Sequence, residues 1–167
     1  QFLASQAKDE APHYQHSELG FNYQMSNICA GIGRGQMKVL DEHITLRRAM
    51  HDFYVSLFEK ISGITVFTIE DPDYFSNYWL TSIIVNPAET KNGIDKETIR
   101  LTLLDSNIEC RPLWKPMHLQ PLYKNYPFYG EKVAETLFEN GLSLPSGSNL
   151  TDSDRNRIST VILKLLQ

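Results

Sequence analysis

Apolar residues between positions 26 and 61 recur at spacings near three, four and seven. Such a repeat is typical of an amphipathic helix, because side chains three and four positions apart lie on the same face. Ser26 precedes the repeat and is a favoured N-cap residue, whereas Ser-Gly-Ile at 62–64 ends it. The pattern predicts one continuous helix over residues 26–61, roughly 50 Å long.

The pattern changes after this helix. Residues 64–69 (ITVFTI) and 78–85 (YWLTSIIV) are β-branched and aromatic runs of strand length, and the turn-rich EDPDYFSN separates them. We expect these two runs to pair as antiparallel neighbours.

The remainder of the chain alternates between helical and extended patterns. The predicted elements are a helix over 95–107 with Asp95 as its N-cap, a short strand over 108–113, a helix over 130–141, a strand and turn over 142–147, and a helix that starts near Thr151. Thr151 and Asp154 have the spacing of a capping box, with Asp in place of Glu. Helices packed on a small antiparallel sheet constitute an α+β fold.

The first 25 residues have few periodic apolar positions and predict an ordered loop or extended arm. The expected organisation is therefore an arm over 1–25, a long inter-domain helix over 26–61 and a small α+β domain over 62–167. The sequence opens with QFLASQAKDE and no initiator methionine. We therefore expect the chain to be cut from a longer polypeptide.

Composition narrows the function classes. A hydrophobic fraction of 41% and a charged fraction of 22% are typical of a folded globular chain. The formal charge of -4 supplies no general positive field for a nucleic-acid backbone, so nucleic acid is not an expected partner. The sequence contains no run of about 18 apolar residues, so it predicts no membrane-spanning helix. Two cysteines outside any metal-ligand spacing indicate reduced thiols in a cytoplasmic protein.

Two groups of residues invite interpretations that the sequence does not favour. The glycines of GIGRG (31–35) lie inside the helical pattern, so they indicate close helix packing rather than a phosphate-binding loop. His13 and His16 have no further ligands near them in sequence, so no metal site is predicted. His43 and His51 are most simply interpreted as side chains on the solvated face of the long helix.

The segment 110–123, CRPLWKPMHLQPLY, carries more chemistry than its surroundings. Its three prolines exclude a regular helix or a central strand. It offers groups that bind anions, stack on rings or titrate: Arg111, Trp114, Lys115 and His118. A stiff loop at the end of a strand is a common mount for binding groups, although a packed surface loop with solvated charges is an equal alternative from the residues alone.

A second candidate lies just before the predicted long helix. Asn22, Tyr23 and Gln24 precede free backbone N–H groups and the positive end of a helix dipole, which is a suitable place for an anion such as phosphate. Asparagine is also an ordinary turn and cap residue, so the residues leave both interpretations open.

Three segments together resemble a known family. HYQHSELGFNYQMSNICAGIGRGQM, RPLWKPMHLQPLY and LSLPSG are similar, in this order, to the C-terminal half of the DegT/DnrJ/EryC1/StrS family of pyridoxal-phosphate-dependent nucleotide-sugar aminotransferases. The resemblance implies an aspartate-aminotransferase-like fold of type I. In this fold a large N-terminal domain carries the cofactor and its lysine, and a long helix leads into a smaller C-terminal domain.

The resemblance also assigns roles to residues. Asn22 matches the family asparagine that reaches the cofactor phosphate of the neighbouring subunit, and Gln24 replaces the arginine of the same motif. His118 matches the residue that faces the nucleotide-sugar pocket, with Lys115, Trp114 and Arg111 beside it. None of the nine lysines has the family's serine- and glycine-rich context, so we expect no catalytic residue in this chain and no activity from it alone.

The expected parent enzyme transfers an amino group, from glutamate, to a nucleotide-linked keto sugar in amino-sugar or surface-polysaccharide biosynthesis. Its expected cofactor is pyridoxal 5'-phosphate, and a homodimer mate is expected to complete its active site. Two alternatives remain from the sequence: a non-catalytic regulatory relative of the family, and a free-standing carbohydrate-binding domain.

Overall fold

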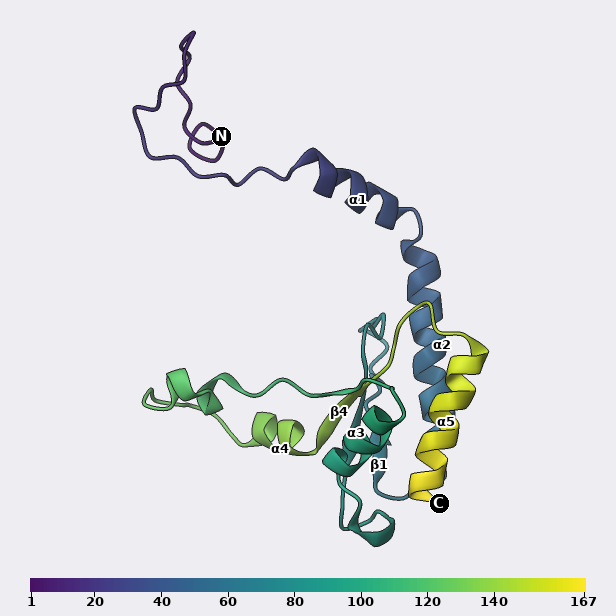
Figure 1. The fold of residues 1–167 in the computed structure, drawn as a ribbon. Coiled ribbons are helices and arrows are strands. Elements are labelled where there is room, and N and C mark those ends of the chain that lie inside the picture. The colour runs from purple at the N-terminus through teal and green to yellow at the C-terminus, as the bar shows by residue number, and fades with distance from the viewer. The chain divides into compact units, whose positions relative to one another are not determined.

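The computed structural model describes residues 1–167, and Figure 1 labels its α-helices and the strands β1 and β4. The chain divides into two compact units, Gln1–Asp41 and Glu42–Gln167. Five α-helices are present: α1 (Asn27–Met37), α2 (Leu40–Phe58), α3 (Lys96–Asp105), α4 (Val133–Asn140) and α5 (Asp152–Leu166). Three short 3-10 turns accompany them: η1 (Lys91–Gly93), η2 (Met117–Leu119) and η3 (Pro121–Tyr123).

The predicted continuous helix over 26–61 is wrong, because α1 ends at Met37 and α2 begins at Leu40. The N–H groups of Lys38 and Val39 donate three residues back, to Gly35 and Gln36, which tightens and ends the last turn of α1. The three glycines of α1 supply the physical reason, since each lowers helix stability by about 0.5–1 kcal/mol relative to alanine. The predicted N-cap is confirmed: Ser26 accepts a hydrogen bond from the Cys29 N–H at 3.2 Å.

The second unit is built on a four-stranded antiparallel sheet. Its strands are β1 (Ile64–Val66), β2 (Thr81–Val85), β3 (Arg111–Pro112) and β4 (Gly141–Leu144), in the spatial order β1-β2-β4-β3. The predicted pairing of the first two strands is confirmed, with Ile64 opposite Val85. β3 is an edge strand, which is where the sheet tolerates Pro112.

One hydrophobic core joins this sheet to three helices. In β2 the residues Thr81, Ile83 and Val85 are buried and alternate with partly exposed ones, so a single face of the strand carries the core. The core also contains apolar side chains from α2, α3, α5 and β4: Met50, Tyr54, Phe58, Ile99, Leu103, Leu142, Leu144, Ile158, Ile162 and Leu166. The α+β architecture predicted from the sequence is confirmed.

The predicted helix caps of this unit are also confirmed. Asp95 accepts hydrogen bonds from the side chain and the N–H of Thr98, and these bonds lower the pKa of its carboxyl group. Thr151 and Asp154 form a capping box at the start of α5, and the hydroxyl of Thr151 lowers the pKa of Asp154 in the same way.

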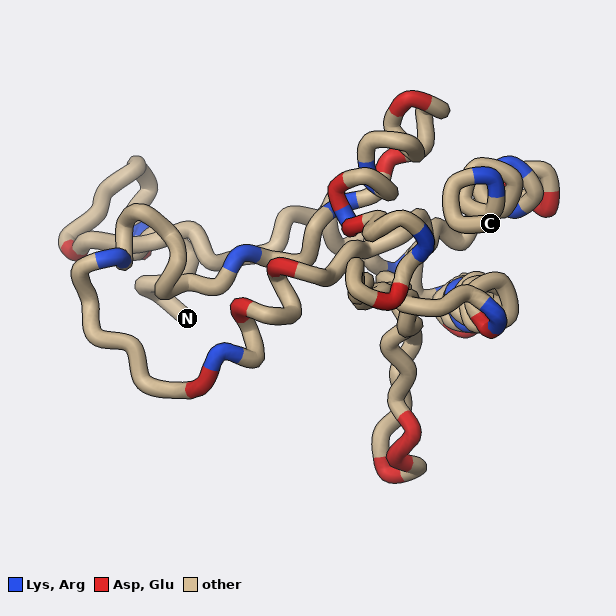
Figure 2. The backbone as a smooth tube through the Cα atoms, turned by 90° about the horizontal axis from the view of Figure 1, so that it is seen from below, with Lys and Arg blue, Asp and Glu red and all other residues tan.

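Charged residues of both signs are distributed along the backbone, and acidic residues gather at the tip of the connection between β1 and β2 (Figure 2). This connection, residues 67–80, contains Glu70, Asp71 and Asp73 and neither Lys nor Arg. None of the helices is both long enough and apolar enough to cross a bilayer.

Candidate functional site

The predicted cofactor-binding residue Asn22 lies in the first unit, where two short segments run antiparallel. Asn22 forms an isolated β-bridge with Ser5. On either side of it, the Phe21 N–H donates to the Leu3 carbonyl at 2.7 Å and the Tyr23 N–H donates to the Ala4 carbonyl at 2.9 Å. The backbone of Asn22 is therefore held between two hydrogen bonds.

The side chain of Asn22 is exposed, and so is that of Gln24. The rings of Phe21 and Tyr23 stack on each other with centroids 5.4 Å apart, which further orders the segment. An exposed carboxamide on a fixed backbone can donate N–H groups to an anion. These residues thus fit a contact to the phosphate group of pyridoxal phosphate.

A cleft of about 370 Å³ lies in the second unit, at the edge of the sheet next to β3. Two of the predicted substrate-binding residues, Arg111 and Trp114, line it, whereas Lys115 and His118 do not. The other lining residues come from the β1–β2 connection, from β3 and the two residues before it, and from β4 and the two residues after it: Trp79, Leu80, Glu109, Cys110, Pro112, Ser143, Leu144, Pro145 and Ser146.

The cleft combines aromatic surface with a charged pair. Residues Trp79 and Trp114 are 60% and 70% exposed, so both indoles are available for stacking. Arg111 lies 2.7 Å from the carboxylate of Glu109, and both side chains are exposed. Because an exposed ion pair contributes little to stability, this guanidinium can exchange its partner for another anion at low cost.

Cys110 is the one thiol in the cleft lining, and it is 8% exposed. Burial raises the pKa of its thiol to about 11, with the Arg100 charge opposing the shift. The thiol therefore remains protonated near neutral pH and has the character of a packing residue rather than a nucleophile.

His118 lies on the same segment but turns away from the cleft. Its Nε2 is 3.0 Å from the Glu135 carboxylate in α4, and its ring stacks on Phe128 with centroids 3.7 Å apart. Only 17% of the His118 side chain is exposed. Its contacts thus tie the proline-rich segment to α4.

The expected irregular backbone of segment 110–123 is confirmed. It consists of β3 followed by the turns η2 and η3, and each turn starts beside a proline. Lys115 is exposed, and its carbonyl accepts a hydrogen bond from the Gln120 side chain at 3.4 Å. The segment therefore brings Arg111 and Trp114 to one cleft and holds His118 apart from it.

One residue that shapes the cleft was not identified from the sequence. Arg47 in α2 donates to the carbonyl groups of Trp79 and Ser146, the latter at 3.0 Å, so it connects two walls of the cleft. Its partners are 32 and 99 positions away in the sequence. No local pattern indicates such a contact.

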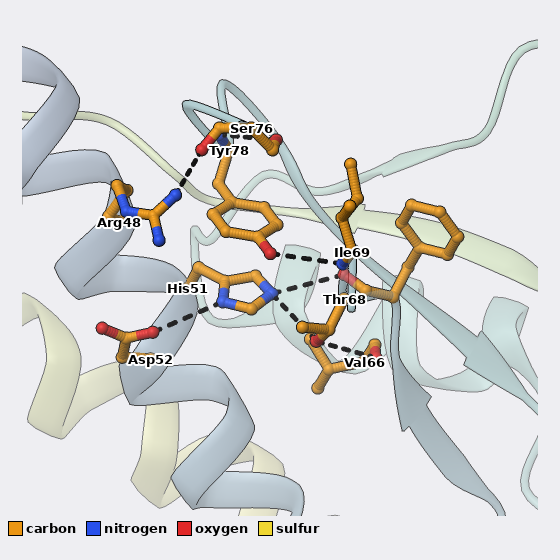
Figure 3. A network of polar contacts seen from close by, with 9 residues as sticks. Arg48, His51, Asp52, Val66, Thr68, Ile69, Ser76 and Tyr78 are labelled. Atoms are coloured by element: carbon orange, nitrogen blue, oxygen red, sulfur yellow. Dashed lines mark hydrogen bonds and ion pairs between the residues drawn. The ribbon is translucent and has the colours of Figure 1, made fainter. Parts of the chain in front are cut away.

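The prediction that His51 is solvated is wrong, since only 2% of the residue is exposed. Figure 3 shows His51 between α2 and the β1–β2 connection, with its ring stacked on Tyr78 at 3.6 Å. Its Nε2 lies 3.3 Å from the Thr68 hydroxyl, and Asp52 is 3.5 Å from its Nδ1. The β1–β2 connection covers this face of α2. Helical periodicity does not reveal such a contact, so it assigned His51 to the solvated face.

Arg48 completes this cluster. It donates to the Ser76 carbonyl at 2.5 Å, and its guanidinium lies 5.3 Å from the centre of the Tyr78 ring (Figure 3). Tyr78 has a left-handed backbone with φ of 46°, an uncommon conformation for an aromatic residue. The cluster fixes the backbone next to Trp79 and hence one wall of the cleft.

The two histidines of the first unit do not converge. His13 Nε2 is 3.1 Å from the Gln15 side chain, and His16 Nδ1 contacts the Gln6 carbonyl. No group of three or more His, Cys, Asp or Glu side chains in the chain is arranged to hold a metal ion.

Comparison with known proteins places the chain in a family. Residues 2–163 match the model of the DegT/DnrJ/EryC1/StrS aminotransferase family. EpsN of Bacillus subtilis (strain 168), whose assignment as a pyridoxal phosphate-dependent aminotransferase is itself provisional, is 43% identical over 98% of this chain and 42% of its own length. GDP-perosamine synthase of Escherichia coli O157:H7 is 34% identical over 83% of this chain and 36% of its own length.

Solved structures agree on the fold. The aminotransferase PseC of Helicobacter pylori, involved in pseudoaminic acid biosynthesis, has a TM-score of 0.79 at 20% identity, over 99% of this chain and 44% of that one. The aminotransferase TlmJ of Streptoalloteichus hindustanus has a TM-score of 0.78 at 21% identity, over 96% of this chain and 42% of that one. The chain thus spans about two fifths of the length of the relatives it matches. It belongs to the DegT/DnrJ/EryC1/StrS aminotransferase family, whose members depend on pyridoxal phosphate.

Proposed function

We propose that the longer protein containing this chain transfers an amino group, from glutamate, to a keto sugar linked to a nucleotide. The observation that carries the proposal is the family match over residues 2–163, together with relatives such as GDP-perosamine synthase. When bound, pyridoxal phosphate supplies the chemistry by accepting the amino group from the donor and passing it to the keto carbon. This chain supplies binding groups.

Asn22 and Gln24 are the residues we propose for the cofactor phosphate. Both side chains are exposed, and the backbone of Asn22 is fixed by its bridge to Ser5. The family resemblance assigns this asparagine to the cofactor of a neighbouring subunit, so the proposal includes a homodimer. Gln24 offers an uncharged donor in place of the family arginine, which gives a weaker contact to the phosphate than an ion pair.

The nucleotide sugar is assigned to the segment that follows Cys110. Arg111 and Trp114 line the cleft and offer a cation for phosphate and an indole for stacking. Lys115 adds an exposed cation on the same segment. His118 does not line this cleft, and we propose that it holds the substrate wall in shape through its contacts with Phe128 and Glu135.

The direct test uses the purified intact protein with pyridoxal phosphate, glutamate and a panel of nucleotide-linked keto sugars. Mass spectrometry of the products should detect an amino sugar with at least one of them. Tight binding of a nucleotide sugar without any turnover, in protein loaded with cofactor, would contradict the aminotransferase and support a non-catalytic relative.

Two substitutions in the intact protein separate the proposed roles. Asn22→Ala should weaken cofactor retention about ten- to a hundredfold, because a hydrogen bond to a charged group is lost. His118→Ala should lower kcat/KM for the nucleotide sugar and leave the glutamate half-reaction nearly intact. Single-turnover absorbance of the cofactor follows each half-reaction separately. Equal slowing of both half-reactions by His118→Ala would show that this residue acts on the cofactor or the fold.

A further inference from the structure

The loop that presents Asn22 is closed by a histidine with no role in the functions considered so far. His16 Nδ1 lies 2.9 Å from the Gln6 carbonyl oxygen and 3.2 Å from the Ala7 carbonyl oxygen. Carbonyl oxygens only accept hydrogen bonds, so Nδ1 must carry the proton and donate to both. One side chain therefore connects residue 16 to a backbone segment nine and ten positions earlier.

The backbone that receives this bond has an uncommon conformation. Gln6 and Ala7 both have left-handed φ values, 73° and 51°, and neither is a glycine. Such a conformation is unfavourable for residues with a Cβ and persists where surrounding contacts hold it. Ala7 is fully buried within the loop, and the His16 bond satisfies the carbonyl groups at this turn.

This turn is attached directly to the Asn22 segment. The Gln6 N–H donates to the Phe21 carbonyl at 3.0 Å, and the bridge between Ser5 and Asn22 follows immediately. Gly20 packs so closely on the turn that a Cβ on it would lie 2.2 Å from the Gln6 carbonyl carbon. The conformation at Gln6 and Ala7 thus sets the position of the strand that carries Asn22.

We infer that His16 is a positioning residue for cofactor binding, which fixes Asn22 through the Gln6–Ala7 turn and the Ser5–Asn22 bridge. The inference rests on the proposed contact between Asn22 and the cofactor phosphate. His16 itself requires no contact with the cofactor or the substrate. The Gln6 and Ala7 carbonyl oxygens require a hydrogen-bond donor at the position of Nδ1. A donor at the position of Nε2, on the far side of the ring, cannot replace it.

The test compares four variants of the intact protein loaded with pyridoxal phosphate: His16→Ala, His16→Asn, His16→Gln and His13→Ala. The asparagine amide nitrogen matches the position of Nδ1 and the glutamine amide matches Nε2. His13 is the matched control, since it belongs to the same loop but contacts only the Gln15 side chain. The two readouts are cofactor loss on dilution and amide hydrogen exchange in residues 17–23.

We expect His16→Ala to lose cofactor about three- to tenfold faster, because the bond is exposed to water and its net strength is that of an ordinary hydrogen bond. Amide hydrogen exchange at Phe21 and Tyr23 should accelerate together with the loss of cofactor. His16→Asn should restore both readouts, whereas His16→Gln should behave like His16→Ala. His13→Ala should match the wild type.

A double variant distinguishes this inference from the proposed phosphate contact. In the Asn22→Ala background, His16→Ala should add little further cofactor loss, because the group that it positions is already absent. If Asn22→Ala loses cofactor but His16→Ala retains it like the wild type, the phosphate contact stands and the inference about His16 is overturned. If Asn22→Ala itself retains cofactor, the phosphate contact is wrong, and the role of His16 in cofactor binding falls with it. Additive losses in the double variant would also overturn the inference.

Discussion

The two units of this chain are stabilised by different interactions. In Glu42–Gln167 a continuous apolar core joins three of the four strands, β1, β2 and β4, to α2, α3 and α5. In Gln1–Asp41 the only buried residue is Ala7, and the loop is held by backbone hydrogen bonds and by polar side chains such as His16 and Asp9. Apolar burial stabilises the unit that contains the cleft, whereas a few directional contacts fix the unit that carries Asn22.

The difference has a consequence for function. Apolar burial is non-directional and is shared among many contacts, while a hydrogen-bonded loop without a core depends on each contact. We therefore expect substitutions in the second unit to change its stability, and substitutions in the first unit to change the position of Asn22.

Leu142→Ala should produce the largest loss of stability. Leu142 is fully buried in β4, an inner strand of the sheet, so the substitution removes apolar contacts and leaves a cavity. Substitutions of this kind lower the free energy of unfolding by about 2–5 kcal/mol. Both tryptophans, Trp79 and Trp114, lie in the second unit, so their fluorescence in a denaturant titration reports its unfolding.

The matched control for this prediction is Ile28→Ala in α1. Ile28 is 76% exposed, so its truncation should change the free energy of unfolding, measured in the same titration, by less than about 0.5 kcal/mol. A comparable loss from both substitutions would contradict the contrast between the two units.

Gly20→Ala should disrupt the first unit and leave the second unchanged. The new Cβ would lie 2.2 Å from the Gln6 carbonyl carbon, so the Gln6–Ala7 turn must move away. Overpacking of this kind costs about 1–3 kcal/mol. Amide exchange at Phe21 and Tyr23 should accelerate, while the tryptophan-detected midpoint should remain at its wild-type value.

The control for this glycine is Gly33→Ala. Gly33 lies inside α1, and a Cβ there would meet no atom within 4 Å. The substitution should stabilise α1 by about 0.5–1 kcal/mol, because alanine favours the helix over glycine. Slower exchange in α1 would agree with this expectation. Loss of helix would show that a close partner packs on the glycine face.

Substitution of Asp95 should have a small effect on stability, and this effect should depend on pH. Hydrogen bonds from Thr98 lower the pKa of its carboxyl group in the folded chain. The folded state therefore favours the carboxylate, and the added stability is present above the unfolded pKa and is lost as the pH falls through the folded pKa. Asp95→Ala should lower the free energy of unfolding at pH 7 by about 1 kcal/mol, the typical cost of losing an N-cap side chain.

Asp95→Asn retains the cap acceptor but does not titrate. Between pH 5 and pH 2, on the order of the range in which an Asp carboxyl titrates, its unfolding midpoint should fall less steeply than that of the wild type. Identical slopes for the two proteins would show that this carboxylate contributes nothing to the acid sensitivity of the fold.

The sequence by itself determined the features that depend on neighbouring residues. The caps at Ser26, Asp95 and Thr151 were predicted because their partners lie three positions away. The antiparallel pair β1–β2 and the irregular segment after Cys110 followed from strand composition and from the prolines. The family was identified from motifs in the order in which they occur along the chain.

Tertiary structure alone decided the features whose partners are distant in the sequence. His51 is buried because the β1–β2 connection covers α2, and Arg47 joins two walls of the cleft across 32 and 99 positions. His118 turns from the cleft because Glu135 and Phe128 lie on its other side. Helical periodicity identifies which side chains share a face, but the folded chain determines what covers that face. The positions of Arg111 and Trp114 in one cleft, and of His118 outside it, could therefore not be predicted from the sequence.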